Sequence, residues 1–321
     1  MHRLLPALIL AAALAPGLWW RGSVPERVET VQLDVTRLAV DEPSCLDPAG
    51  DLCREAAWVL TSPHSDFGGY SALVSQPGRL QAFSDRGAGL SFATPGSPAA
   101  EPRFTGTAAI SLRAKRGEDV EAATRLPDGT TWVALESQNV LARLDASGRR
   151  VETIQPRGLA GWPGNTGPEA LVHLRDGRLL VISESRRDST GNAPALLVDP
   201  ARPDEARSIE VALTPEYNVT GADLLPDGRI VILLRSFRYL PPGFFGRIAI
   251  ADPEAIGPDG VMQATPVGRW AHPLPVDNFE GIVAEQADDG SLTVWLISDD
   301  NNLLLQRTIV WRLRWDGWPE G

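Results

Sequence analysis

The sequence predicts an all-β protein, a β-propeller with six blades, or five as the alternative, preceded by an N-terminal signal segment. Three observations predict this fold. A hairpin-like unit recurs about every 50 residues, and no convincing amphipathic helix follows the N-terminus. Glycine and proline are frequent, at 30 and 27 of 321 residues, while 43 % of the chain is hydrophobic, so many turns accompany a large core. A period near 50 with about four strands per unit is typical of a propeller.

The recurring unit contains a polar residue, a short apolar strand, an Asp-Gly or Pro-Gly turn, a second strand and a final polar residue. It is clearest at Glu121–Glu136 and Glu169–Glu184. Asp-Gly between two apolar runs predicts a tight hairpin. We call the first polar residue of a unit its opening residue and the last one its closing residue. The opening residues, separated by 50, 48, 51 and 60 positions, are Ser71, Glu121, Glu169, Thr220 and Glu280.

Five copies of the unit are visible, and the chain length predicts a sixth. The 301 residues after position 20 divide by 50 to give about six units. We expect the sixth blade to come from residues 28–62 together with the C-terminal strands, which would close the ring. The sequence therefore predicts one β-propeller domain over residues 28–318.

The N-terminus predicts export. Residues 1–22 combine Arg3, an apolar run and the small-x-small sequence Ala13–Ala15, as a secretory signal does. The run continues to Trp19 and Trp20, so an uncleaved membrane anchor is the alternative. We expect a periplasmic or extracellular protein that meets a membrane only through this segment. Because export permits disulfides, Cys45 and Cys53, eight positions apart in a loop, are expected to form one.

Composition and charge exclude several functions. The net charge is −11 and no Lys/Arg run exists, which argues against a nucleic-acid partner. The acidic balance favours a cation, a neutral small molecule, or a locally basic pocket in an acidic shell. Two cysteines and four histidines without metal-binding spacing argue against a zinc site. We expect a monomer that binds a small-molecule substrate or ligand.

The opening residues predict a cation site. Equivalent positions of propeller blades point toward one axis, so Glu121, Glu169 and Glu280 are expected to converge. Carboxylates held close together stay ionised only when a cation or an arginine compensates them. Oxygen ligands favour Ca²⁺ before Mg²⁺. The alternative is that these glutamates are solvated strand ends, and Ser71 and Thr220 leave the ring of carboxylates incomplete.

The closing residues form a second candidate layer, comprising Asp85, Glu136, Glu184, Arg235 and Asp299. Arginines follow or occupy this layer and would hold a phosphate or carboxylate group, or form salt bridges between blades; they are Arg86, Arg186, Arg187, Arg235 and Arg307. The run Asp299–Asn302 suits a metal site and equally a tight turn. The sequence contains no Gly-x-Ser-x-Gly motif, which would indicate a serine nucleophile. If the protein is a hydrolase, we therefore expect metal-activated water to attack the substrate.

Several segments resemble the family named for the esterase-like activity of phytase. They are Phe67–Leu73 with Ser84–Gly87, Gly167–Leu171, Asp277–Ile282, Leu296–Asn301 and Gln306–Thr308. The resemblance covers about residues 55–315 and implies an exported propeller with phytase- or esterase-type activity. It marks as motif positions Asp85, Glu169, Glu280, Asp299, Asp300, Asn301 and Arg307. The single lysine, Lys115, favours an ester less charged than phytate.

The combined hypothesis is a metal-assisted hydrolase of phosphate or carboxylate esters. Its cation would be Ca²⁺, held by Glu121, Glu169, Glu280 and Asp299. Asp300 or Asn301 would orient water, and Arg307 would steady an anionic group. Two alternatives remain: a non-catalytic periplasmic propeller that binds a ligand or partner, and a lactonase-like propeller using Asn278 and Asn301.

Overall fold

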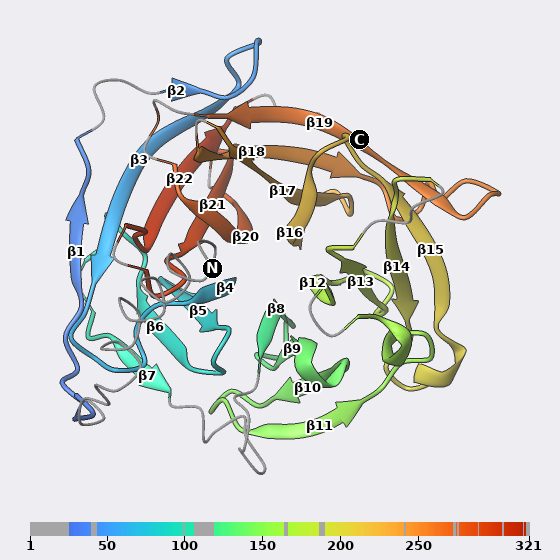
Figure 1. Ribbon diagram of the computed structural model, residues 1–321, viewed down its shortest axis with the longest axis horizontal. Helices are drawn as coiled ribbons and strands as arrows, with labels where there is room; N and C mark the ends of the chain where they lie inside the picture. Colours follow the sequence, from blue (N-terminus) through green and yellow to red (C-terminus); the bar gives the residue numbers. More distant parts are fainter. Residues whose placement is uncertain are drawn as a thin grey trace, which may run out of the picture.

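The computed structural model is a ring of β-sheets around a central axis, with antiparallel strands within each blade (Figure 1). It describes residues 26–39, 44–98, 100–105, 119–163, 166–185, 190–240, 242–271, 274, 276–287, 289–303, 305–316 and 318. The predicted signal or anchor segment, residues 1–22, lies outside these residues. In the described part of the chain, no helix is both long and apolar enough to cross a membrane.

The described strands form five blades. From the axis outward, the first has β4 (Tyr70–Gln76), β5 (Arg79–Ser84), β6 (Gly89–Ala93) and β7 (Arg103–Thr105). The second has β8 (Val120–Arg125), β9 (Thr131–Leu135), β10 (Val140–Leu144) and β11 (Arg150–Ile154). The third has β12 (Pro168–His173), β13 (Leu179–Ser183), β14 (Ala193–Val198) and β15 (Arg207–Ala212).

The last two blades are longer. The fourth has β16 (Asn218–Leu224), β17 (Ile230–Tyr239), β18 (Pro242–Ala251) and β19 (Val261–Trp270). The fifth has β20 (Asn278–Gln286), β21 (Leu292–Asp299) and β22 (Ile309–Trp315), and its outer strand is β3 (Leu52–Thr61). Short strands β1 (Asp34–Arg37) and β2 (Ser44–Cys45) pair with β3. Tryptophans of these two blades, among them Trp270, Trp311 and Trp315, are buried in the largest core cluster.

The all-β propeller prediction is confirmed, but the preferred count of six blades is wrong for the described strands. Residues 28–62 make no blade of their own, because β3 pairs with β22 and completes the fifth blade. The longest interval between opening residues, 60 positions, arises from the extended strands β17, β18 and β19. Dividing chain length by the repeat therefore overestimates the count.

The predicted hairpin turns are present in the structure. In the second blade, the Leu126 N–H donates to the Thr130 carbonyl, and the Gly129 N–H donates to the Leu126 carbonyl. Gly129 has φ +87°, a left-handed conformation that favours glycine. The same pair of hydrogen bonds recurs in the third, fourth and fifth blades.

The predicted disulfide between Cys45 and Cys53 is confirmed, and it joins β2 to β3. Next to it, the Leu46 carbonyl accepts a hydrogen bond from the Arg269 N–H, which connects this corner to β19. Reduction is therefore expected to lower the free energy of unfolding by about 2–3 kcal/mol, the loop-closure value for so short a loop. Urea unfolding with and without dithiothreitol measures it, with the Cys45→Ser/Cys53→Ser double variant as control. An unchanged midpoint after complete reduction would contradict the prediction.

Candidate functional site

All five opening residues are the extra residue of a β-bulge. In the second blade, Val120 pairs with Leu135 and Ala122 with Ala134, so Glu121 has no partner on β9. The same shift occurs in every inner strand, at Ser71, Glu121, Glu169, Thr220 and Glu280. A bulge redirects a side chain out of the regular alternation of a strand. The bulges thus explain why residues about 50 positions apart reach the same end of the axis.

The closing residues lie at this same end. In each blade, the backbone of the closing residue is paired with the start of the inner strand. Its partner there is the residue that comes two positions before the opening residue. The Glu136 N–H donates to the Asp119 carbonyl at 2.9 Å, and Asp299 pairs with Asn278 in the register of β20 and β21. Opening and closing residues therefore make up one polar face, which we call the axial site.

The channel beneath the axial site is narrow. Small residues follow the bulges, namely Ala72, Ala122, Ala170, Gly221 and Gly281. A Cβ at Gly221 would lie 2.5 Å from the Glu280 carbonyl oxygen, so the inner strands of the fourth and fifth blades approach very closely. The remaining space at the axis, lined by Ser71, Glu121, Glu169 and Glu280, is about 10 Å³. That is close to the room one water molecule needs, so a ligand larger than an ion must bind above this point.

One half of the axial site is neutralised by Arg235. Its guanidinium contacts the Glu280 carboxylate and the Asn278 side-chain oxygen, and lies 3.1 Å from Glu184. The Asn278 amide in turn donates to Glu280 at 2.8 Å. Burial still raises the pKa of Glu280, with Arg235 acting in the opposite direction. Glu280 is therefore held mainly as the partner of an arginine.

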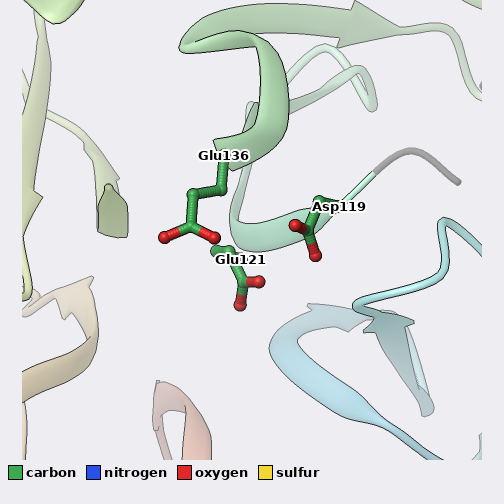
Figure 2. Close-up of side chains that lie close together, drawn as sticks. All are labelled: Asp119, Glu121 and Glu136. Carbon is green, nitrogen blue, oxygen red and sulfur yellow. The ribbon is translucent and has the colours of Figure 1, made fainter. Parts of the chain in front are cut away.

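The other half contains only carboxylates. Oxygens of Asp119, Glu121 and Glu136 lie within 4.8 Å of one another, and the three side chains converge in Figure 2. The Gly167 N–H donates to Glu136 at 2.8 Å. A Cβ at Gly167 would approach Glu136 Cγ to 2.6 Å, so this position requires glycine. No described Lys or Arg forms an ion pair with the three carboxylates. Oxygen ligands in this arrangement fit a hard divalent cation.

Electrostatics support the same interpretation. Burial raises the pKa of Glu121 well above its usual value, and the neighbouring carboxylates Glu169, Glu280 and Asp119 raise it further. Burial likewise raises the pKa of Glu169. The negative charges of neighbouring carboxylates raise this pKa further, and they belong to Glu184, Glu280 and Glu136. Glu169 is 9 % exposed and lies between the two halves. A cation at the carboxylate half would remove much of this repulsion.

The Asp299–Asn302 turn begins in the axial site, at Asp299, but lies outside its carboxylate half. Asp299 is buried, and burial and Glu280 raise its pKa to about 8. Asp300 accepts hydrogen bonds from the Gly69 N–H, the Asn302 N–H and the Thr308 hydroxyl. Its side chain thus connects the first and fifth blades.

The remaining predicted residues face outward. Asn301 has φ +47°, and its amide donates to Gln306 at 2.8 Å. Arg307 is exposed, and its backbone N–H donates to Asp277. Among the predicted residues, the structure therefore brings Glu121, Glu169 and Glu280 together, with Asp299 next to Glu280. The roles proposed for Asp300, Asn301 and Arg307 stay predictions.

Sequence reasoning missed Asp119 and did not rank Glu136 as a ligand. Asp119 lies two positions before Glu121, directly before β8. The signal was available, because polar residues also occupy this position in the fourth and fifth blades, as Asn218 and Asn278. Glu136 is one of the five closing residues, and no sequence pattern distinguishes it from the others as the neighbour of Glu121.

The opposite end of the axis holds a half-buried acid, Asp223. Asp223 on β16 accepts the Ala284 N–H of β20 at 2.8 Å, and it lines a pocket of about 430 Å³ with His173. Burial raises the pKa of Asp223 to about 7. The protonated form is therefore favoured on folding. Its stabilising contribution is complete below pH 4 and is lost as the pH rises through 7.

Asp223→Asn is accordingly expected to stabilise the protein at pH 8 by about 2–4 kcal/mol and to change little near pH 4, because asparagine keeps the acceptor and stays neutral. Urea unfolding across this pH range measures the difference. Asp145→Asn is the control with opposite sign, because hydrogen bonds from Ser147 and Arg149 lower the pKa of Asp145 to about 2. An equal effect of Asp223→Asn at both pH values would contradict the prediction.

Comparison with solved structures finds similar chains of low identity. They include a glutaminyl cyclase from Myxococcus xanthus (13 % identity, 80 % of this chain and 96 % of that chain, TM-score 0.46). A gluconolactonase from Xanthomonas campestris has 12 % identity to this chain, and the match covers 90 % of this chain and 100 % of that one, with TM-score 0.45. A virginiamycin B lyase from Staphylococcus aureus has 10 % identity to this chain, and the match covers 88 % of this chain and 99 % of that one, with TM-score 0.43. None of the curated proteins matches the chain.

A family model matches residues 65–302, which include all five opening residues and all five closing residues. Its description is "Esterase-like activity of phytase", the family that the sequence motifs resemble. The match extends over more than half of the chain, and the chain therefore belongs to this phytase-like family.

Proposed function

We propose that the protein is an exported, monomeric, metal-assisted hydrolase of phosphate or carboxylate esters that acts at the axial site. The observation that carries the proposal is the division of this site. Asp119, Glu121 and Glu136 offer oxygen ligands with no basic partner among the described residues, while Arg235 is fixed beside them by Glu184 and Glu280. Family membership and the predicted signal segment support the activity and the location.

The residues divide the chemistry between them. Asp119, Glu121 and Glu136 would hold Ca²⁺, which when bound polarises an ester oxygen and lowers the pKa of a water molecule. Arg235 is engaged by Glu184, Glu280 and Asn278, so its part is to hold these side chains in place beside the cation. Glu169 lies between the two halves, where burial and neighbouring acids raise its pKa, so we assign to it the proton exchange with the leaving alcohol.

The structure gives less support to the lactonase-like alternative. That reading needs the amides of Asn278 and Asn301 as ligands. The Asn278 side chain is already bonded to Arg235 and Glu280, and the Asn301 amide to Gln306.

A substrate panel tests the proposal. Protein treated with EDTA is assayed with p-nitrophenyl acetate, p-nitrophenyl phosphate and simple lactones, before and after addition of Ca²⁺. We expect Ca²⁺-dependent turnover of a p-nitrophenyl ester that Glu121→Gln abolishes. The control Glu254→Gln, an exposed carboxylate far from the site in sequence, should retain activity. Absence of turnover together with retained Ca²⁺ binding would instead favour the ligand-binding propeller.

A further inference from the structure

A second pocket, with a volume of about 580 Å³, lies on the same face of the ring as the axial site. It is formed by the segment before β16, the end of β17, the residues of β18 around Phe245 and Arg247, and the end of β19. Its basic lining residues are Arg238, Arg247 and Arg269, and its apolar walls include Tyr217, Phe245 and Trp270. In a chain of net charge −11, this concentration of positive charge needs an explanation.

The register of the fourth blade forces two of these arginines together. Arg247 on β18 is directly opposite Arg269 on β19, so both side chains leave the same side of the sheet. Like charges directly opposite each other on neighbouring strands are destabilising. Among the described residues, Arg238, Arg247 and Arg269 form no ion pair, and the acid lining this pocket, Glu216, is exposed.

Aromatic rings hold two of the guanidinium groups in place. The Arg247 guanidinium lies 4.8 Å from the centre of the Tyr217 ring, and that of Arg238 lies 4.5 Å from the Phe245 ring. The Arg247 Nε is buried and has no hydrogen-bond partner among the described residues. A buried donor without a partner costs free energy. Stacked arginines keep their in-plane donors free for a two-pronged contact with an oxyanion.

The pocket lies next to the axial site along one strand. Arg235 of the axial site and Arg238 of the pocket are three residues apart on β17, beyond the point where the shorter blades end. The hairpin that carries Arg238 also exposes Phe237 and Tyr239, which pack edge to face. The surroundings of the arginines are therefore aromatic as well as basic.

We propose that this pocket is a second ligand-binding site, for an oxyanion attached to an aromatic ring, such as an aryl phosphate or aryl carboxylate. Arg247 and Arg269 bind the oxyanion between them, Arg238 supplies a further positive charge, and Tyr217 contacts the ring. The site needs neither a metal nor turnover at the axial site, so it stands independently of the proposed hydrolase activity.

Calorimetric titration with phenyl phosphate, in EDTA and in the Glu121→Gln background, tests the site apart from the carboxylate half. We expect saturable binding that Arg269→Gln weakens by about 10-fold or more. Inorganic phosphate should bind more weakly than phenyl phosphate, and Tyr217→Ala should remove that preference. Arg207→Gln, which changes an exposed arginine on β15, is the charge-matched control and should bind as the parent does.

Arg247→Lys protects the test against a folding defect, because lysine keeps the positive charge but cannot make a two-pronged contact. It should weaken phenyl phosphate binding while leaving the unfolding midpoint unchanged. Absence of saturable binding in the parent protein would overturn the proposal. So would equal affinities in the parent, Arg269→Gln and Arg247→Lys proteins.

Discussion

Arg235→Met is expected to lower the free energy of unfolding by about 3–5 kcal/mol at pH 8, the largest effect of any single substitution that we predict. Arg235 is the cation shared by Glu184 and Glu280, and its positive charge also stabilises Glu169. Methionine occupies a similar volume but leaves these buried carboxylates uncompensated. Urea unfolding at pH 5 and pH 8 measures the effect, which should shrink at the lower pH because protonated carboxylates no longer repel one another.

The control for this result is Arg143→Met. Arg143 is also paired with acids, at 2.8 Å from Asp128, but that pair is exposed to solvent. Exposed pairs contribute about 0–1 kcal/mol, so this variant should unfold almost as the parent does. Equal losses in the two variants would show that Arg235 acts only as one more surface charge.

Glu121→Gln is expected to raise the Ca²⁺ dissociation constant by about 100-fold or more, because it removes one of three converging carboxylates. Even residues that only support a metal ligand commonly change affinity 10–100-fold. Isothermal titration of EDTA-treated protein measures the affinity. Glu254→Gln is the matched control, with the same chemical change on an exposed side chain.

The same substitution has a second, opposite effect without Ca²⁺. Burial and neighbouring acids raise the pKa of Glu121, so its stabilising contribution is complete below its unfolded pKa and lost at higher pH. Glutamine stays neutral, so metal-free Glu121→Gln should be more stable than the parent protein at pH 8 and similar to it near pH 4. A variant that loses stability at pH 8 and keeps its Ca²⁺ affinity would rule out a cation site at this position.

The predictable parts of this protein were those encoded by local repetition. Glu121, Glu169 and Glu280 share one position of a repeated unit, so their convergence followed once a ring was inferred. The bulges at these positions could not be foreseen, because each depends on pairing with the next strand. The prediction of a sixth blade was wrong for the same reason, because the pairing of β3 with β22 joins distant parts of the chain.

Within the site, the sequence could not assign partners. Arg235 occupies a position in the repeat equivalent to Glu136, and only the structure shows that its charge is shared by Glu184 and Glu280. Asp119 precedes the repeated unit and was therefore overlooked. Distances between side chains of different blades decide which carboxylates remain without a basic partner. A sequence pattern does not contain these distances.

Closure of the fifth blade by β3 has a kinetic consequence. Val59 pairs with Ile309, so this contact joins residues 250 positions apart. Closing so long a loop costs chain entropy before any contact compensates, so pairings of this kind form late and slowly. The closed ring brings Glu121 of the second blade near Glu280 of the fifth, so the repulsion between these two carboxylates requires ring closure. A bound cation is therefore expected to slow ring opening far more than it accelerates ring closure.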